Sequence, residues 1–384
     1  MPQSSHRARS RPGNQLLQTI GIVLVLGLIV AGIAVAKLSG ADTAVADASD
    51  DSSLVGGPTT AVDDATDTTD ATDDPTDDAT TDEATEATEA SETAATEAAR
   101  AATARKLERK VDARKAELAD RVKEAEQLAR ELRRQRELLS APFDVRVGSL
   151  NVLGSQHTAP GGTRRSYPPA SVRSPQQAGL ISKQGLEIVG MQELQEDQLN
   201  SISSRTGLTA YPGYAWGSKE TDNSILYDAG RFEMVSGDQF TIPFMGRPRP
   251  QPILRLRVRA TGREFYVVNT HPSAGHGGRY AAERAHGQDV LVGVLEDLKS
   301  TGLPILLTGD MNDREGFYDR VVCRGGMVSA SGGSGCASRP SQMHAVDWVA
   351  GSPSVSFTSY VSDTEAGDRR LTDHYFIHTT AHVG

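Results

Sequence analysis

From Pro142 onward the chain alternates between short hydrophobic runs with strand character and longer segments with helical periodicity. Residues 143–151 and 264–270 are typical of strands, whereas residues 171–184 and 280–299 have the apolar spacing of helices. Strands and helices that alternate in this way, in two strand-rich halves, predict a layered α/β fold with mixed sheets. This part of the chain is long enough to bury one hydrophobic core.

Polar residues gather where the predicted strands begin or end. The clusters are Ser149-Leu150-Asn151, Gln192-Glu193, Asn269-Thr270-His271, Gly309-Asp310-Met311-Asn312 and Thr372-Asp373-His374. Ligand sites in layered α/β folds form at strand ends, so we expect these clusters to meet at one edge of the sheets. Taken singly, each cluster is also typical of a turn or a solvated loop, because Gly, Asp and Asn favour turns.

In this order the clusters resemble the motifs of the endonuclease/exonuclease/phosphatase superfamily. Its members include deoxyribonuclease-I-like nucleases, abasic-site endonucleases, inositol polyphosphate phosphatases and neutral sphingomyelinases. The resemblance spans about residues 144–379 and also includes Asn223-Ser224-Ile225-Leu226-Tyr227 and Val346-Asp347-Trp348-Val349. It implies a four-layered α/β/β/α sandwich of two mixed sheets that hydrolyses phosphoric esters with a divalent metal.

The resemblance assigns metal and phosphate contacts to individual residues. Glu193 is expected to be the principal ligand of a divalent cation, with Asn151 beside it. Asp373 is expected to serve the metal region or the neighbouring His374, and Asn223 is a weaker candidate for a phosphate contact. Hard oxygen donors, without a cysteine or histidine cluster, favour Mg²⁺, Mn²⁺ or Ca²⁺ over Zn²⁺. Such a cation neutralises a phosphate ester oxygen during in-line displacement.

The resemblance also assigns the proton-transfer residues. His374 is expected to be the base or a phosphate ligand, oriented by Asp347, since a carboxylate on one ring nitrogen fixes the tautomer and raises basicity. Asp310 is expected to position or deprotonate the attacking water, and Asn312 to hydrogen-bond the phosphate. His271 is expected to donate to the phosphate or to the leaving oxygen. The resemblance leaves open whether Asp310 or His374 takes the proton.

The substrate also stays open, because nucleases, lipid phosphodiesterases and phosphatases of this superfamily share these residues. Residues 141–384 hold 23 Lys/Arg and 24 Asp/Glu. This balance argues against a strongly basic nucleic-acid binder, although a local basic groove is compatible with it. We expect an exported nuclease first, and a sphingomyelinase-like or inositol-phosphatase-like enzyme as the alternative. A non-catalytic, anchored binding module is the second alternative.

The N-terminal part of the chain predicts export. An apolar run over residues 16–36 is long enough to cross a bilayer as a helix, and three arginines precede it. Residues 41–100 follow with 18 Asp/Glu and one Lys/Arg. The positive-inside rule therefore predicts a single-pass signal anchor, with a basic tail (1–15) in the cytoplasm and the catalytic domain (141–384) outside the cell. The alternative is a cleaved signal peptide and a secreted protein.

Between the apolar run and the catalytic domain we expect two segments. Residues 41–100 contain no aromatic residue and predict a disordered acidic spacer. Residues 101–140 have leucines at a 4-3 spacing among alternating charges, which predicts a charged helix, either single or paired as a coiled coil in a homodimer. The two cysteines, Cys323 and Cys336, exclude a four-cysteine zinc site and favour a disulfide in an exported domain.

Overall fold

The structure is a computed structural model that describes residues 83–214, 221–333, 335–337, 340 and 345–384. The predicted tail, the predicted signal anchor and the spacer before residue 83 lie outside the described residues. Within those residues, no helix combines the length and the apolar character that a membrane span requires. The chain divides into two units, Met1–Arg130 and Glu131–Gly384.

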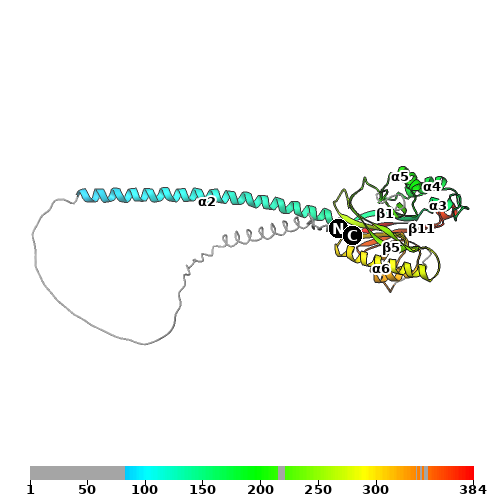
Figure 1. Cartoon of the computed structure of the whole chain (residues 1–384). Helices are drawn as coiled ribbons and strands as arrows, with labels where there is room; N and C mark the ends of the chain where they lie inside the picture. Colours follow the sequence, from blue (N-terminus) through cyan, green and yellow to red (C-terminus); the bar gives the residue numbers. More distant parts are fainter. Residues whose placement is uncertain (1–82, 215–220, 334, 338–339, 341–344) are drawn as a thin grey trace, which may run out of the picture. The chain divides into compact units, whose positions relative to one another are not determined.

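Helix α2 spans Glu83–Ser140 as one uninterrupted run of 58 residues (Figure 1). It begins inside the segment predicted to be disordered, so the predicted boundary between spacer and helix at residue 101 is wrong. Residues 83–100 are rich in Ala and Glu, which are strong helix formers, and this composition extends the helix. Leu107 and Leu118 are among the large apolar side chains of α2 that are exposed. The coiled coil stays a prediction.

The first sheet of the second unit has six strands in its described part. Their order is β11 (Val355–Asp363), β12 (Phe376–Val383), β1 (Phe143–Asn151), β2 (Ile188–Gln192), β4 (Ile225–Tyr227) and β3 (Thr209–Tyr211). Strands β1 and β2 are parallel, and the other neighbours are antiparallel. The sheet is therefore mixed, as predicted.

The second sheet also has six described strands and is also mixed. Their order is β5 (Phe232–Phe244), β6 (Arg247–Val258), β7 (Glu264–Thr270), β8 (Ile305–Asp310), β10 (Asp347–Gly351) and β9 (Val328–Ser329). Strands β7 and β8 are parallel, and the remaining pairs are antiparallel. Strand β5 is continuous over its 13 residues.

Helices cover the outer face of each sheet (Figure 1). Helices α4 (Ala170–Lys183) and α5 (Glu196–Thr206) pack on the first sheet. Helix α6 (Gly278–Ser300), with the short α7 (Glu315–Phe317) and the π-helix η2 (Tyr318–Arg324), packs on the second. The short helices α3, η1 and α8 span Ser155–Thr158, Thr221–Asn223 and Glu365–Asp368. The predicted α/β fold of two mixed sheets is confirmed, in the order helix, sheet, sheet, helix.

The main core lies between the two sheets. Val147 and Ile188 of the first sheet belong to one buried cluster with Leu254, Val267 and Leu306 of the second. The inward-facing side chains of both sheets interdigitate and exclude water, which is the main source of folding stability. This packing fixes the two sheets relative to each other and therefore fixes the ends of their strands.

Strand register brings the predicted polar clusters to the same ends. Asn151 pairs with Gln192 across the parallel strands β1 and β2. Asp310, the last residue of β8, pairs with Asp347, the first residue of β10. Thr270 at the end of β7 pairs with Gly309. The carboxyl ends of the parallel strands thus carry polar side chains in both sheets.

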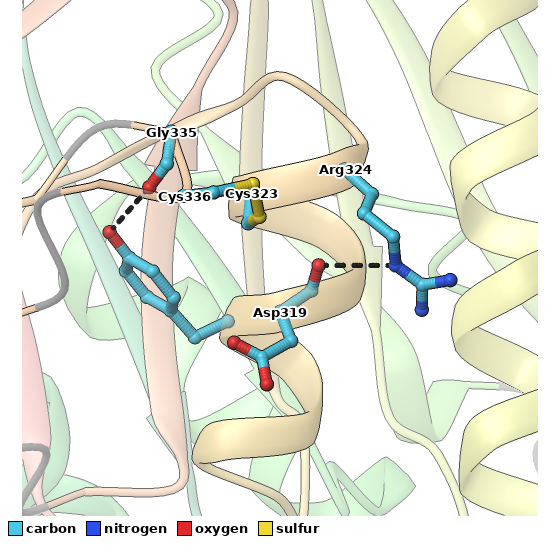
Figure 2. Close-up of a disulfide and its surroundings, with 6 residues drawn as sticks. Asp319, Cys323, Arg324, Gly335 and Cys336 are labelled. Atoms are coloured by element: carbon cyan, nitrogen blue, oxygen red, sulfur yellow. Dashed lines mark hydrogen bonds between the residues drawn. A yellow bond between two sulfur atoms is a disulfide. The ribbon is translucent and has the colours of Figure 1, made fainter.

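A disulfide links Cys323 of η2 to Cys336, as predicted from the sequence (Figure 2). The phenolic hydroxyl of Tyr318 donates to the backbone carbonyl of Gly335, 3.2 Å away, beside the bridge. The two contacts hold the segment after β9 against the outer helical layer of the second sheet.

Candidate active site

The side-chain amide of Asn151 lies between two carboxylates. Its Nδ2 donates to Glu193 Oε1 at 3.1 Å and to Asp310 Oδ2 at 3.0 Å. Its Oδ1 accepts a hydrogen bond from the backbone N–H of Leu153, which fixes the amide orientation. The hydroxyl of Thr372 donates to the backbone carbonyl of Asn151. A single buried side chain at the end of β1 therefore connects the ends of β2 and β8, which belong to different sheets.

Glu193 follows β2 with a left-handed backbone (φ 59°), a conformation that is costly for a residue with a side chain and that clusters at functional sites. Its Oε2 accepts from the backbone N–H of Gly154 at 3.0 Å and lies 3.3 Å from Nε2 of His157. Burial disfavours the charged form, but the contact with His157, the nearby His271 and the hydrogen bonds from Gly154 and Asn151 hold the pKa of Glu193 well below its ordinary value. The carboxylate is ionised and partly open to solvent.

Asp310 is buried and surrounded by donors. Its Oδ2 lies 3.3 Å from Nε2 of His271 and 3.6 Å from Nε2 of His374, and its Oδ1 accepts from the backbone N–H of Asn312. Burial opposes ionisation, but the two imidazoles outweigh it and hold the pKa of Asp310 below its ordinary value. Asn312 has a left-handed φ of 48° and donates its side-chain amide to the carbonyl of Pro272.

His374 lies between two carboxylates. Its Nδ1 is 3.0 Å from Asp347 Oδ1 and 3.2 Å from Asp347 Oδ2, while its Nε2 faces Asp310. Burial lowers the pKa of His374, but the charges of Asp347 and Asp310 outweigh burial and raise that pKa well above its ordinary value. Burial raises the pKa of Asp347. The ligand atoms of Asp310, Asp347 and His374 lie within 4.8 Å of one another, a group that could also hold a metal ion.

Asn223 reaches the site through an intermediary. Its Nδ2 donates to Oε1 of Gln251 at 3.1 Å, and the same oxygen accepts from the backbone N–H of His271 at 2.7 Å. The ring of Phe244 packs edge-on against the ring of His271, with centroids 5.1 Å apart. Gln251 lies inside strand β6, and nothing in its sequence context distinguishes it from a buried strand residue.

The loop that follows β1 supplies two residues that the sequence analysis did not assign. His157 contacts Glu193, and Arg164 donates from Nε to Oδ2 of Asp373 at 2.9 Å. Asp373 is thus engaged by an arginine on the same loop that carries His157. In the sequence, only the position of the loop points to His157 and Arg164 as site residues. The loop begins directly after Asn151, which ends strand β1 at the candidate site.

A buried arginine holds the backbone on which the site is built. Arg173 of α4 donates to the carbonyl oxygens of Val152 at 2.6 Å, Leu153 at 2.7 Å and Leu371 at 2.9 Å. Gln177, one turn further along α4, donates to the carbonyls of Val152 and Leu371. These bonds join the segment after Asn151 to the segment before His374.

The donor atoms fit a hard divalent cation at Glu193. The carboxylate is ionised and reachable from solvent, and Asn151 and Gly154 fix its orientation through hydrogen bonds. Carboxylate oxygen is the preferred ligand type of Mg²⁺, Mn²⁺ and Ca²⁺.

Comparison with known proteins identifies the fold. No protein-family model and no curated protein matches the sequence. A solved endonuclease/exonuclease/phosphatase family protein from Bacteroides thetaiotaomicron matches with 20% identity and a TM-score of 0.50, over 63% of this chain and 96% of its own. The chain has the endonuclease/exonuclease/phosphatase fold. In this chain Asn151, Glu193, His271 and Asp310 lie at or directly after the carboxyl ends of the parallel strands. Asp347 begins β10, and His374 lies before β12.

Two further solved structures are similar at lower scores. A mannosyl-6-phosphatase from Bacteroides thetaiotaomicron VPI-5482 is 19% identical, with a TM-score of 0.47, over 62% of this chain and 99% of its own. The catalytic domain of human Nocturnin is 17% identical, with a TM-score of 0.47, over 63% of this chain and 95% of its own.

Proposed function

We propose that the protein is a divalent-metal-dependent phosphoric ester hydrolase, and first of all a nuclease. One observation carries the proposal: Asn151 bridges the ionised carboxylates of Glu193 and Asp310, and Asp310 in turn faces two imidazoles. A buried carboxylate that faces two histidines is costly to assemble, because each group must be desolvated. Turn or capping roles would not require this arrangement.

The geometry supports a proton path in which these residues act in sequence. Asp310 orients the attacking water and accepts its proton, and His374 donates from Nε2 to a phosphate oxygen while Asp347 holds Nδ1. His271 donates the proton that the leaving oxygen requires. Because His271 Nε2 lies 3.3 Å from Asp310 Oδ2, the proton taken from water can return to His271. The cation held by Glu193, when bound, neutralises charge on the phosphate (Mg²⁺, Mn²⁺ or Ca²⁺).

Basic groups on the β5–β6 hairpin and α6 favour a nuclease. A shallow cavity of about 450 Å³ lies between these two elements, and Arg247, Arg279 and His286 line it together with Glu283, which pairs with Arg279 at 3.1 Å. Phe244, the last residue of β5 in this hairpin, packs against the ring of His271. Cationic side chains near a phosphoesterase site attract a second phosphate of a nucleic-acid strand.

A lipid or small-molecule phosphodiesterase or phosphatase is the alternative. The near-neutral charge of residues 141–384 favours it. The guanidinium of Arg249 also favours it, since this group is paired with Asp222 at 2.8 Å and stacked 3.5 Å above Phe244, which reduces the positive charge available to a polyanion.

Hydrolysis of plasmid DNA, RNA, sphingomyelin and bis-p-nitrophenyl phosphate, with Mg²⁺ and with EDTA, tests the proposal. Activity that EDTA abolishes and that Asp310→Asn removes supports it. Asp297→Asn on the exposed surface of α6 is the matched control and should retain full activity. If none of these four substrates is hydrolysed, the result contradicts the nuclease and the phosphodiesterase and favours the non-catalytic binding module.

We also propose that the catalytic domain is exported and anchored by residues 16–36. The three arginines before the apolar run and the disulfide between Cys323 and Cys336 support this. Protease added to intact cells should release the catalytic domain. Survival of the domain until the cells are lysed would contradict export.

Size measurement of the released domain with and without α2 would test the proposed homodimer through residues 101–140.

A further inference from the structure

A histidine that the mechanism does not use lies against the candidate metal ligand. Nε2 of His157 is 3.3 Å from Oε2 of Glu193. The side chain of His157 is 35% exposed and that of Glu193 is 22% exposed, so solvent and ions reach both. A separation of this size also matches two neighbouring ligands of one ion, each about 2.1–2.2 Å from it and about 90–100° apart.

The other nitrogen of the His157 ring is also engaged. Nδ1 lies 3.1 Å from the hydroxyl oxygen of Thr163. Without a cation, the Nε2–H of His157 faces the carboxylate of Glu193. With a cation between the two groups, donation from Nδ1 to Thr163 leaves the lone pair on Nε2, directed toward that ion. Histidines that bind metals are oriented in the same way, through a hydrogen bond from the nitrogen that does not bind the ion.

The backbone around His157 is held in a closed loop. The N–H of His157 donates to the carbonyl of Gly154 at 3.0 Å, and the N–H of Arg164 donates to the carbonyl of His157 at 2.8 Å. At Gly162 a Cβ atom would lie only 2.3 Å from the carbonyl oxygen of His157, so the close return of the loop requires a glycine. Ser155 anchors the loop to α5, because its N–H donates to Gln198 Oε1. These hydrogen bonds hold the loop in place, so the ring of His157 lies against Glu193 in a fixed position.

We propose that Nε2 of His157 and Oε2 of Glu193 are ligands of the same divalent cation, and that this site prefers a first-row transition ion to Mg²⁺. The inference rests on the proposed metal-dependent function. Imidazole nitrogen suits transition ions, whereas Mg²⁺ retains oxygen ligands and water. The proposal adds one nitrogen ligand to the oxygen ligands that the sequence predicts.

Pulsed electron paramagnetic resonance of Mn²⁺ bound to the full-length chain tests the proposal. The wild-type spectrum should show a coupling to ¹⁴N of a directly bound imidazole, and His157→Gln should remove it. His157→Gln should also raise the Kd for Mn²⁺ about tenfold or more, while the Kd for Mg²⁺ changes by less than about threefold. His382→Gln is the matched control, because His382 pairs with Asp144 at the opposite end of β1 from Asn151. It should keep both the coupling and the affinity.

Two results would overturn the inference. Bound Mn²⁺ without any nitrogen coupling in the wild-type protein would show that His157 is not a ligand, whether or not a variant folds. A coupling that persists in His157→Gln and disappears in His374→Gln would place the ion at Asp310, Asp347 and His374 instead. Neither result depends on turnover, so failure of the inference is distinguishable from failure of the proposed hydrolase activity.

Discussion

Nδ1 of His374 lies 3.0 Å from Oδ1 of Asp347, and the two residues belong to different sheets. Asp347 begins β10 in the second sheet, whereas His374 lies two residues before the first residue of β12 in the first sheet. The Asp347 carboxylate is almost completely buried between them, so it contacts the ring without competition from bulk water. The contact sets the orientation of His374, because the ring can present only Nε2 to Asp310 and to a substrate.

Substitutions of His374 and of Asp347 should therefore differ in how much they lower kcat. His374→Ala removes the group that donates to the phosphate, and we expect kcat to fall by about 10²–10⁴-fold, the usual contribution of an acid–base group. Asp347→Asn removes only the orienting carboxylate and should produce a smaller loss. Hydrolysis of bis-p-nitrophenyl phosphate measures both, with circular dichroism as the check on folding. Rates per folded molecule within twofold of wild type for both variants would contradict the assignment.

Glu193→Gln should act through the metal. An amide is a weaker ligand than a carboxylate, so the variant should lose activity at low metal concentration and regain part of it in excess Mg²⁺ or Mn²⁺. His374→Ala, assayed in parallel, should not recover, since no metal replaces its proton. The assay is a metal titration of the hydrolysis rate. Equal recovery of the two variants would argue against separate roles for them.

Much of the fold could be predicted from the sequence. The sequence predicts strands over residues 143–151 and 264–270, because both runs are hydrophobic and are bounded by turn residues. The structure has β1 and β7 over those residues. The predicted polar clusters meet because strand ends in adjacent sheets must meet once the sheets pack. The extent of α2 before residue 101 was missed, since a low-hydrophobicity segment of Ala and Glu has the composition of both a disordered spacer and a helix.

The parts of the site that could not be predicted depend on contacts between distant residues. His157 is significant because its loop returns to Glu193, and Gln251 because it reaches the backbone of His271. Neither residue belongs to a local motif. Arg173 resembles an ordinary helix arginine in the sequence, and only the structure shows that it is buried against carbonyls on both sides of the site.

Arg173→Met should destabilise the domain. The substitution keeps an unbranched side chain but removes the donors to the carbonyls of Val152, Leu153 and Leu371. Gln177 still donates to two of these carbonyls and Gln198 to that of Leu153, so the carbonyl of Pro168 is the acceptor that loses its donor. One buried acceptor left unpaired costs about 1–3 kcal/mol, and we expect a loss of that size. Urea denaturation measures the free energy of unfolding.

The matched control is Arg205→Met, at an exposed position of α5. Surface substitutions of this kind usually change stability by less than about 0.5 kcal/mol. Equal effects of the two substitutions would show that the carbonyl contacts of Arg173 do not stabilise the fold.

Reduction of the disulfide should destabilise the same domain to a limited extent. Cys323 and Cys336 are separated by 13 residues, and closing so short a loop contributes at most about 3 kcal/mol in the chain-entropy description. Urea denaturation with and without dithiothreitol measures the difference. Thiol titration of the denatured protein should find no free thiol before reduction. Two reactive thiols in that sample would exclude the bridge.

Acid should destabilise the domain in part through His378. This residue of β12 is buried and packs against the ring of Phe376, with centroids 5.3 Å apart. Burial lowers the pKa of His378 below its ordinary value of 6.5, so the unfolded chain binds the proton more readily than the folded one. The contribution of the neutral ring to stability is therefore complete above pH 6.5. It is lost as the pH falls toward the folded-state pKa, by at most about 1.4 kcal/mol per pH unit.

His378→Phe should flatten the decline of the free energy of unfolding below pH 6.5, measured by urea denaturation at a series of pH values. His276→Gln, in the exposed loop before α6, should leave the decline as it is in the wild type. An identical decline in His378→Phe and in the wild type would show that His378 is not part of the acid response.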